Sequence, residues 1–318
     1  MNAVAVTGAS GLIGTALRGV LAARGVPVRA LVRSRERACA VGDTETVVVG
    51  CVSDPRAVSE ACADSGAIVH LARSTHRIED LCRFDYPAMY AVLAAANTNA
   101  AELHFPSSQA VFGNADGYPP PVLDDGTPPN PCTAYGAMKA AFEWTAKATC
   151  RIPPVVYRLP VVVPARLSDG APWLRHLLAG GFCHLDVARR TVNLMPLDER
   201  FQHGGLSFVH VEDVVATIAA NLFREPARGT VAMLADPEYL TFRELADVYA
   251  DAARCLGYTV RTMWAVPGGG PCTVERMFRF DTTTATARLG FTSEAGRARL
   301  FGKLTDWFAA AAGAPHPP

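Results

Sequence analysis

The sequence predicts an α/β protein in which a doubly wound parallel sheet is accompanied by a smaller, discontinuous α/β part. Two observations predict this fold class. A short apolar strand beginning at Val4 leads directly into glycines at positions 8, 11 and 14, and a helical pattern follows. Strand-like apolar segments then alternate with helical patterns through the first half of the chain, which predicts right-handed crossovers between parallel strands.

The elements expected in the first half follow from apolar runs and their spacing. A loop rich in glycine and proline, residues 114–131, leads into a helix close to where a substrate would lie. The expected strands lie at residues 26–32, 47–50, 67–71, 103–106 and 154–163, and the expected helices at 88–96 and 134–148.

The pattern changes in the second half. Residues 166–205 mix one helical segment with irregular polar stretches, whereas residues 206–223 return to a strand and a helix typical of a core. Thr241, followed by Glu244 three residues on, predicts a capping box for a helix over residues 239–256. The remaining expectations are a helical segment at 172–178, a helix at the end of 276–300 and a frayed tail at 309–318.

Composition and charge exclude several classes of protein. The 318 residues are 50% apolar, which is ample for a core, and 30 basic residues balance 30 acidic ones. No basic block indicates nucleic acid or an anionic membrane as a partner, and no apolar run reaches the ~18 residues of a membrane span. Nine scattered cysteines, no zinc-like Cys/His spacing and no charged leader predict a reduced, cytoplasmic protein without a metal site.

The glycines after the first strand favour binding of a dinucleotide. Glycine lets the backbone turn sharply and approach a pyrophosphate, which sits at the positive end of the following helix. The spacing is Gly-x-x-Gly-x-x-Gly, because Ala9 stands where the commoner fingerprint has its first glycine. An ordinary tight turn is the alternative, but the position between a strand and a helix favours a cofactor site.

A second pattern, Tyr135 followed by Lys139, predicts acid–base chemistry. Residues four apart project from the same face of a helix. A protonated lysine beside a tyrosine favours the phenolate, which lowers a pKa that starts near ~10. Such a phenol can exchange a proton with a carbonyl or hydroxyl, and Ser108 could hold the same oxygen. By itself the pair is weak evidence, since most such pairs lie on solvated helix surfaces.

With these patterns present, the chain resembles the extended short-chain dehydrogenase/reductase family over nearly its whole length. The resemblance rests on five segments in the family's order, namely residues 7–14, 69–72, 107–113, 131–139 and 208–214. It implies that Ser108 is the active hydroxyl and Tyr135 the proton donor. It also implies that Lys139 tunes Tyr135 and bonds the nicotinamide ribose, and that helices around 88–96 and 134–148 pair two copies as a homodimer.

The resemblance also implies a division of the chain. A Rossmann domain of residues 1–165, to which 206–223 return, would bind the dinucleotide, and residues 166–310 would form the substrate-binding domain. The implied cofactor contacts are Thr7, Gly8, Ser10, Gly11, Leu12, Ile13, Gly14, Arg33, Arg37, Cys51, Val52, Leu71, Ala72, Arg73, Tyr135, Lys139, Leu159 and Val161.

The end of the second strand favours NADP(H), with NAD(H) as the alternative. Sites for NAD place an acid there to accept the ribose hydroxyls, whereas this chain has Arg33, with Arg35 and Arg37 following. These guanidinium groups could pair with a 2′-phosphate, or they could form a basic, solvated helix start. Cys51 stands where relatives commonly have the aspartate that contacts adenine, and Asp54 follows.

Three departures from the family favour an NADPH-dependent ketone or aldehyde reductase acting on a small carbonyl substrate. Leu206 replaces an arginine that pairs with the diphosphate of nucleotide sugars, and Val161 replaces a nearby asparagine. Gln109 and Ala110 replace the acidic pair of dehydratases. A further departure concerns the proton relay rather than the substrate, because residues 84–86 with Asp85 stand where relatives tend to have a helix asparagine. The alternative is a nucleotide-sugar epimerase with bound NAD, and a cofactor-sensing binding protein is less favoured because the Ser/Tyr/Lys set is intact.

Several histidines and aromatic residues have two interpretations. His76, with Arg73 and Arg77, follows the fourth strand and either contacts substrate or lies in a solvated loop. His70 and His210 lie in family-like strands, where packing is expected. The aromatic residues that either line an apolar pocket or belong to the core are Trp173, Phe182 and Trp264.

Overall fold

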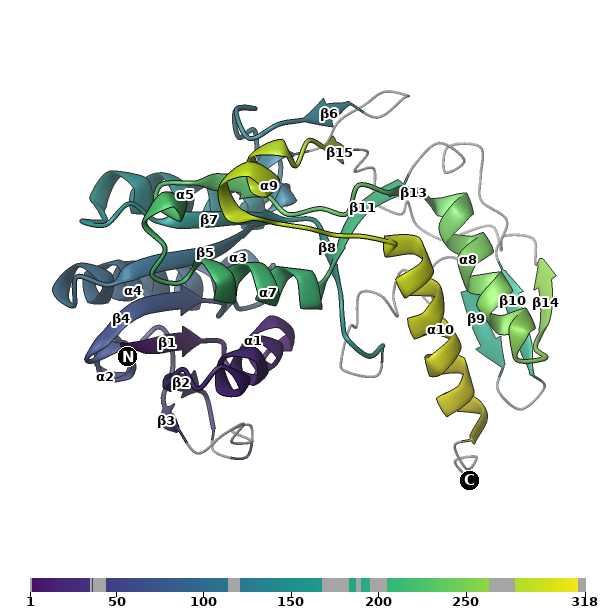
Figure 1. Cartoon of the computed structure of the whole chain (residues 1–318), viewed down its shortest axis with the longest axis horizontal. Coiled ribbons are helices and arrows are strands. Elements are labelled where there is room, and N and C mark those ends of the chain that lie inside the picture. The colour runs from purple at the N-terminus through teal and green to yellow at the C-terminus, as the bar shows by residue number, and fades with distance from the viewer. Residues whose placement is uncertain are drawn as a thin grey trace.

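The computed structural model describes residues 2–34, 36, 44–113, 121–167, 183–186, 190–194, 205–262 and 278–313. A seven-stranded parallel sheet in the order β12-β7-β5-β4-β1-β2-β3 forms its centre (Figure 1). The doubly wound parallel sheet expected from the sequence is therefore confirmed. Its strands are β1 (Ala3–Thr7), β2 (Val28–Val32), β3 (Glu45–Val49), β4 (Ser65–His70), β5 (Glu102–Ser108), β7 (Val155–Leu159) and β12 (Val231–Met233).

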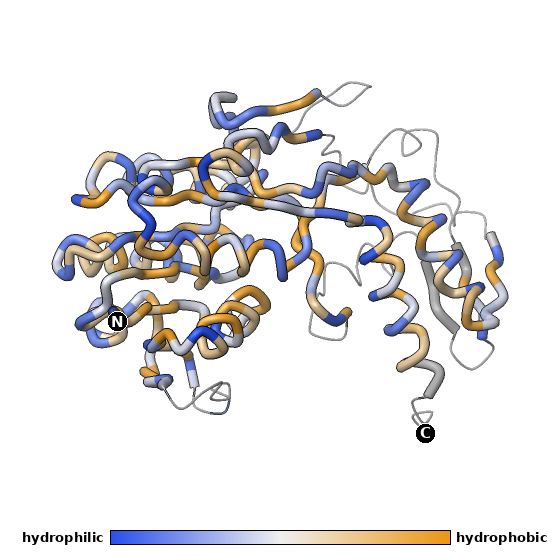
Figure 2. Tube along the Cα trace, in the orientation of Figure 1, coloured by the Kyte–Doolittle hydropathy of each residue, from blue (hydrophilic) through white to orange (hydrophobic). Residues whose placement is uncertain are grey.

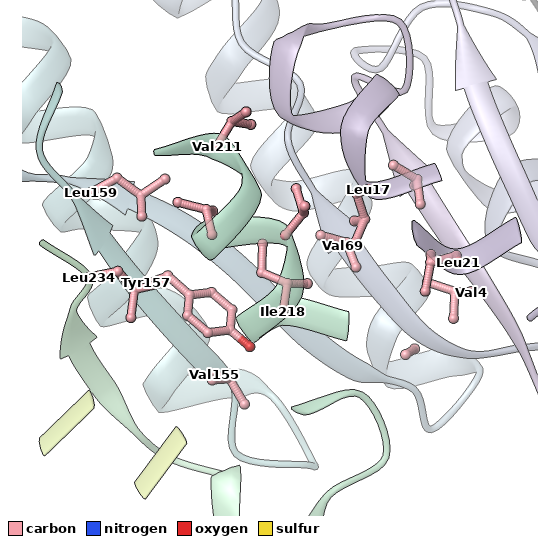
Figure 3. Close-up of a cluster of buried hydrophobic side chains, with 14 of the residues drawn as sticks. Val4, Leu17, Leu21, Val69, Val155, Tyr157, Leu159, Val211, Ile218 and Leu234 are labelled. Atoms are coloured by element: carbon pink, nitrogen blue, oxygen red, sulfur yellow. The ribbon is translucent and has the colours of Figure 1, made fainter. Parts of the chain in front are cut away.

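Helices cover both faces of this sheet (Figure 1). Because successive side chains of a strand point to opposite faces, β1 contributes to two separate clusters. Val4 packs with Leu17 and Ile218 on the face covered by α1 and α7, part of which is shown in Figure 3. Ala5 packs on the face covered by α2, α4 and α5. These helices are α1 (Leu12–Ala23), α2 (Pro55–Cys62), α4 (Tyr86–Thr98), α5 (Ala134–Thr149) and α7 (Val211–Asn221).

The strand expected at residues 154–163 is divided in two by Pro160. β7 ends at Leu159 in the large sheet, and β8 (Val161–Val163) begins a separate three-stranded sheet. Proline has no N–H for a strand ladder, so the pairing pattern changes at this residue. In the second sheet, β11 (Gly205–His210) runs parallel to β8 and antiparallel to β13 (Tyr239–Thr241). The break carries the chain out of the large sheet beside its carboxyl edge.

A second core lies away from the large sheet, on the right of Figure 1. There α8 (Phe242–Cys255) packs against α10 (Gly296–Gly313), and Tyr249 contacts Phe308 with ring centroids 4.9 Å apart. The capping box expected at Thr241 and Glu244 is confirmed, since each side chain bonds the other's backbone. A further sheet joins β9 (Cys183–Asp186), β10 (Thr191–Leu194) and β14 (Thr259–Thr262).

The division into two domains stays a prediction, and one strand lies outside the range expected for it. Residues 231–233 were expected in the smaller domain, yet as β12 they pair with β7 in the large sheet. The helical segment expected at 172–178 lies outside the described residues, as do Trp173, Phe182 and Trp264. The remaining elements are α3 (Ile78–Asp80), the π-helix η2 (Leu81–Asp85), η3 (Gln109–Phe112), β6 (Val122–Leu123), η5 (Glu225–Ala227), β15 (Arg279–Phe280) and α9 (Thr283–Leu289).

Hydrophobic residues recur along the strands of the sheet, where they appear as orange stretches in Figure 2. Burial follows the same pattern, because all five residues of β7 are buried. Such continuous burial is typical of parallel strands that are covered on both faces. Among the described residues, no helix has the length and apolar character needed to cross a membrane.

Candidate active site

The glycine loop after β1 packs so closely that side chains cannot be added. Gly8 has a φ of +67°, and a Cβ there would lie 2.5 Å from the backbone nitrogen of Ala72. A Cβ on Gly14 would lie 2.3 Å from the carbonyl oxygen of Gly8. Gly11 stands at the N-cap of α1 without a side-chain cap, and the first turn carries no acid. The N–H groups of this turn can therefore receive a diphosphate, which fits the dinucleotide expected from the sequence.

The end of β4 closes the other side of the same loop. The backbone N–H of Ala72 donates to the Thr7 hydroxyl at 3.3 Å, and that hydroxyl also bonds His70 Nδ1 at 2.8 Å. The Leu71 N–H donates to the Thr7 carbonyl at 3.2 Å. Burial, reinforced by the charge of Lys139, lowers the pKa of His70 to about 3. His70 is thus a neutral, packed residue, as the sequence predicted.

A buried arginine on α1, which the sequence analysis missed, supports the glycine loop from behind. Arg18 Nη2 donates to Glu45 Oε2 at 2.7 Å, and Arg18 Nε donates to the other oxygen of the same carboxylate. Arg18 Nη1 also donates to the Ala9 carbonyl at 3.2 Å. The forked pair fixes both the loop and the start of β3, because two parallel N–H···O bonds define the orientation of the guanidinium. An arginine within an otherwise apolar helical face was the available signal.

The residues expected to select the cofactor lie at the carboxyl edge of the sheet, but only some are described. Arg33 is exposed and directly follows β2, which lies next to β1. Cys51 follows β3, and its Sγ lies 3.0 Å from the Ser53 hydroxyl. Asp54 caps α2 by accepting from the Arg56 N–H at 2.9 Å, so this carboxylate has a local structural partner. Arg35 and Arg37 lie outside the described residues.

The catalytic residues expected from the sequence come from two elements that touch. Ser108 ends β5, and its Oγ accepts from the Ala110 N–H at 3.1 Å. Tyr135 lies in the first turn of α5, where the Thr133 hydroxyl accepts from the Gly136 N–H at 3.1 Å. A Cβ on Gly136 would lie 2.2 Å from the Ala110 carbonyl oxygen. The start of α5 therefore packs directly on the backbone that follows Ser108.

Lys139 lies one turn beyond Tyr135 and is buried between the helix and β5. Its Nζ donates to the Pro106 carbonyl at 2.9 Å and lies 4.4 Å from the Phe105 ring centroid. The distance from Nζ to the Tyr135 ring centroid is 5.9 Å. Burial lowers the pKa of Lys139 to about 8, Asp85 raises it and Arg73 lowers it. The lysine therefore remains largely protonated at neutral pH, and its charge favours a phenolate nearby.

Asp85, which the sequence places near the family's usual helix asparagine, anchors the loop that follows β4. It is buried at the end of η2, and both of its oxygens accept from the Ser74 N–H at 3.2 Å. The Ser74 hydroxyl donates to the same carboxylate. The charge of Asp85 raises the pKa of Lys139, so this carboxylate favours the protonated form of the lysine. A role for Asp85 in proton relay stays a prediction.

The loop anchored by Asp85 places a histidine on Tyr135, the proton donor expected from the sequence. The rings of His76 and Tyr135 are stacked, with centroids 4.4 Å apart and planes inclined by 21°. Arg73 Nη1 lies 3.1 Å from His76 Nε2. His76 is exposed in this loop and lies on Tyr135, and a contact with substrate stays a prediction. His210, by contrast, is fully buried and bonds the Gly296 carbonyl at 3.0 Å.

An ion pair behind the site was also missed from the sequence. Arg158 on β7 donates through Nη2 to Glu143 Oε2 at 2.8 Å, and the Ser107 hydroxyl donates to Glu143 Oε1. Glu143 follows Tyr135 and Lys139 at spacings of eight and four on α5, so the spacing itself was the available signal. The pair ties α5 to two strands of the sheet. Across the described segments, no group of three or more His, Cys, Asp or Glu side chains could hold a metal ion.

Comparison with known proteins agrees with this architecture. The model of the NAD dependent epimerase/dehydratase family matches residues 4–230. A dTDP-glucose 4,6-dehydratase of Mycolicibacterium smegmatis is 30% identical over 159 residues, which are 46% of this chain and 48% of that protein. The chain thus matches about half the length of this relative.

Solved structures of similar fold span nearly the whole chain. MoeE5 in complex with UDP-glucose and NAD has a TM-score of 0.75 and 22% identity, covering 97% of this chain and 99% of its own. The UDP-glucose 4-epimerase of Thermus thermophilus in complex with NAD has a TM-score of 0.73 and 23% identity, covering 98% of this chain and 99% of its own. At such identities the likeness concerns the fold. The match of the family model over most of the chain shows that it belongs to the NAD dependent epimerase/dehydratase family, the extended short-chain dehydrogenase/reductase type of enzyme.

Proposed function

We propose that this chain inverts a hydroxyl-bearing carbon of a nucleotide-activated sugar, using a bound nicotinamide dinucleotide that is restored in each turnover. The observation that carries the proposal is the packing of the α5 start on the backbone after Ser108, which holds Tyr135 and Lys139 near the end of β4 that closes the glycine loop. The names of the similar proteins support a sugar nucleotide, since they include a dTDP-glucose dehydratase and structures with UDP-sugars. Epimerisation therefore ranks ahead of the carbonyl reduction favoured from the sequence.

The residues of the chain supply proton transfer and orientation. A bound nicotinamide would supply the redox chemistry, namely uptake of a hydride from one face of the sugar carbon and its return to the opposite face. Tyr135 takes the proton of the sugar hydroxyl as the hydride leaves and gives it back when the hydride returns. Ser108 holds the same oxygen by a hydrogen bond, and the ammonium of Lys139 stabilises the phenolate form of Tyr135. Each step needs a phenol that can change protonation near neutral pH.

Dehydration is disfavoured by the residues next to Ser108. Removal of water requires an acid and a base beside the leaving hydroxyl. Gln109 and Ala110 follow Ser108 in η3, and both are buried without a carboxyl group. Asp85 and Glu143 both raise the pKa of Lys139, so they are the acids near the site. Each already has a bonded partner, since Ser74 bonds both oxygens of Asp85 and Arg158 bonds Glu143. We therefore expect sugar epimers rather than a 4-keto-6-deoxy product.

Substitution of Tyr135 tests the central step. Tyr135→Phe removes one oxygen, so turnover should fall by about 10²–10⁴-fold while cofactor affinity changes little. Tyr90→Phe is the matched control, because Tyr90 is exposed on α4. The assay follows interconversion of UDP- or dTDP-hexose epimers by chromatography. Near-native turnover by Tyr135→Phe would disprove the proposed role.

One observation favours a second candidate, an NADPH-dependent reductase of a ketone or aldehyde. Arg33 directly follows β2 where an acid would bind the ribose of NAD, so NADP(H) would bind more tightly than NAD(H). A reductase must release its oxidised cofactor, whereas an epimerase retains it. Denaturing the purified protein and chromatographing the released nucleotide separates the two. NAD in full complement supports the epimerase; substoichiometric cofactor with NADPH consumed on a carbonyl compound supports the reductase.

Calorimetric titration of Arg33→Asp with both dinucleotides tests the cofactor preference alone. If Arg33 selects NADP(H), this variant should lose affinity for NADP(H) and gain affinity for NAD(H). Equal affinities of the native protein for both, unchanged in the variant, would end the NADP assignment.

We also propose a homodimer formed through α4 and α5. These helices pack side by side, and each exposes one large aromatic residue, Tyr90 at 64% and Trp144 at 74%. Pairing with a second copy would cover both rings. Light scattering at micromolar concentration should give twice the chain mass, and Trp144→Glu should give monomers. A monomer mass for the native chain would rule the dimer out.

A further inference from the structure

We infer that His76 is a positioning residue for Tyr135: its imidazole lies on the phenol ring, and Arg73 holds the imidazole there. The inference rests on the proposed role of Tyr135 and applies equally to epimerisation and carbonyl reduction, since both use the same phenol. No part of the family motifs in the sequence required a ring at this position. The geometry that carries it is the stack, with centroids 4.4 Å apart and planes inclined by 21°.

The loop that carries His76 is held to the neighbouring helix by side-chain bonds on either side of the histidine. Before it, the Ser74 N–H and hydroxyl both donate to Asp85. Beside it, the Thr75 hydroxyl donates to Asp80 Oδ2 at 2.5 Å and accepts from the Arg77 N–H at 3.1 Å. Because Asp85 is buried, the anchor is removed from competing water. The position of the imidazole is therefore set by the loop rather than by chance contact.

Arg73 fixes the form of the imidazole. A guanidinium can only donate, so the contact of Arg73 Nη1 with His76 Nε2 at 3.1 Å requires that Nε2 accept. In that hydrogen bond the imidazole carries its hydrogen on Nδ1. The ring stacks on the phenol from the loop, whereas Lys139 lies near the phenol on α5. Two elements thus hold one phenol, α5 through the backbone and the loop through the ring.

A stacked pair of rings stabilises one orientation of both partners. Tyr135 must keep its hydroxyl directed at the reacting oxygen, which Ser108 also holds, and misorientation of a proton donor lowers the rate rather than the affinity. Loss of His76 should therefore lower kcat and leave KM and cofactor affinity nearly unchanged. A phenyl ring at the same place should stack equally well without any polar edge.

Three variants test this, namely His76→Ala, His76→Phe and the control Arg77→Ala in the same loop. Arg77 is exposed, and its side chain pairs with Glu79 at 3.5 Å, also exposed, so its loss should change nothing measured here. We expect kcat of His76→Ala to fall roughly three- to tenfold, with KM unchanged, and His76→Phe to recover most of it. Both native side chains are exposed in the fold, so the variants should fold normally.

A second measurement needs no substrate. Tetranitromethane nitrates accessible tyrosines, and peptide mass spectrometry reports each site separately. Tyr135 should nitrate several-fold faster in His76→Ala than in the native protein, and His76→Phe should restore the native rate. Tyr90 on α4 has the same surroundings in all of these proteins, so its nitration rate should stay constant and serves as the internal reference. Unchanged nitration and kcat in His76→Ala, or a His76→Phe variant as impaired as His76→Ala, would overturn the inference. Loss of the proposed function would appear differently, as absence of epimer interconversion in the native protein while the nitration pattern persists.

Discussion

Two charged networks in this chain use the same kinds of side chain but differ in their access to water. The first lies behind the active site, where the side chains of Arg158 and Glu143 are 6% and 8% exposed. The second lies where α10 meets the junction of β11 and α7. There Lys303 bonds Glu212, a carboxylate that is 44% exposed, and Arg299 bonds Asp213 at 2.6 Å.

The difference teaches what each network contributes. In the first, neither charge can be hydrated, so each depends on the other, and removing one leaves an uncompensated charge. Arg158 has little to replace Glu143, because its Nη1 is buried and has no hydrogen-bond partner among the described residues. Its guanidinium lies 4.9 Å from the Phe112 ring centroid. In the second network water can replace a lost partner, so an ion pair there contributes less to the stability of the fold.

The largest effect is expected from Glu143→Met. This change keeps the volume but leaves the buried Arg158 charge without its hydrogen-bonded carboxylate, so the free energy of unfolding should fall by about 3–5 kcal/mol. Urea unfolding followed by circular dichroism measures it. The double variant Glu143→Met with Arg158→Met is the control, since two apolar side chains of similar size remove both charges together and can be nearly neutral. Equal losses in the single and double variants would mean that volume, rather than charge, decides the outcome.

Lys303→Met should cost less, by about 1–3 kcal/mol. Lys303 Nζ donates to the Pro164 carbonyl at 2.7 Å, to His210 Nδ1 at 3.0 Å and to Glu212 at 2.9 Å. The substitution removes all three bonds, but the free-energy cost is reduced because the Glu212 carboxylate can bond water instead. Added salt should weaken the contact of Lys303 with Glu212, so the difference in free energy of unfolding between the native protein and Lys303→Met should become smaller. The corresponding difference for Glu143→Met should not change with salt, because that pair is buried. A salt-independent Lys303→Met difference would contradict the comparison.

The dependence of stability on pH tests the second network, because His210 belongs to it and is buried. Burial lowers the pKa of His210 below its ordinary value of 6.5, and Lys303 and Arg299 lower it further, although the bond to the Gly296 carbonyl raises it. The unfolded chain therefore binds a proton that the folded chain does not, and stability is present above pH 6.5 and falls as pH falls below it. His70, whose pKa is lowered to about 3, contributes in the same direction.

The measurement compares the native protein with His210→Gln at about pH 7.5 and about pH 5, on either side of the ordinary histidine pKa. The variant cannot take up the proton, so its stability should fall less between the two values than that of the native protein. His70 remains in both and cancels from the difference. Equal slopes would show that His210 is not held neutral in the folded chain.

These contrasts also show what the sequence could reveal. The glycine loop, the Tyr135–Lys139 pair and the Thr241 capping box depend on spacing within one or two elements, and periodicity exposes such spacing directly. The strands and their parallel order followed from the alternation of elements. The break at Pro160 was overlooked because apolar residues continue on both sides of it. There the missing N–H outweighs the hydrophobic pattern.

Contacts between distant elements were beyond the sequence. Arg158 and Glu143 meet across a strand and a helix, and His76 reaches Tyr135 from a separate loop. Nothing in a linear pattern specifies which arginine a given carboxylate meets, because the sheet order and the tilt of α5 decide it. The acid at position 85 was noticed, but its partner Ser74 depends on the path of the loop.

The smallest effect on the free energy of unfolding is expected from an ion pair that is exposed to water on both sides. Arg254 and Asp251 lie three residues apart on α8 and bond at 2.7 Å, yet their side chains are 57% and 61% exposed. Holding two long side chains together costs conformational entropy that offsets most of the attraction in water, so Arg254→Ala should change the free energy of unfolding by less than about 0.5 kcal/mol. Urea unfolding at low and high salt checks this value. A loss as large as that of Lys303→Met would mean that exposure does not set the strength of these pairs, since the Arg254 bond is as short as those in the buried network.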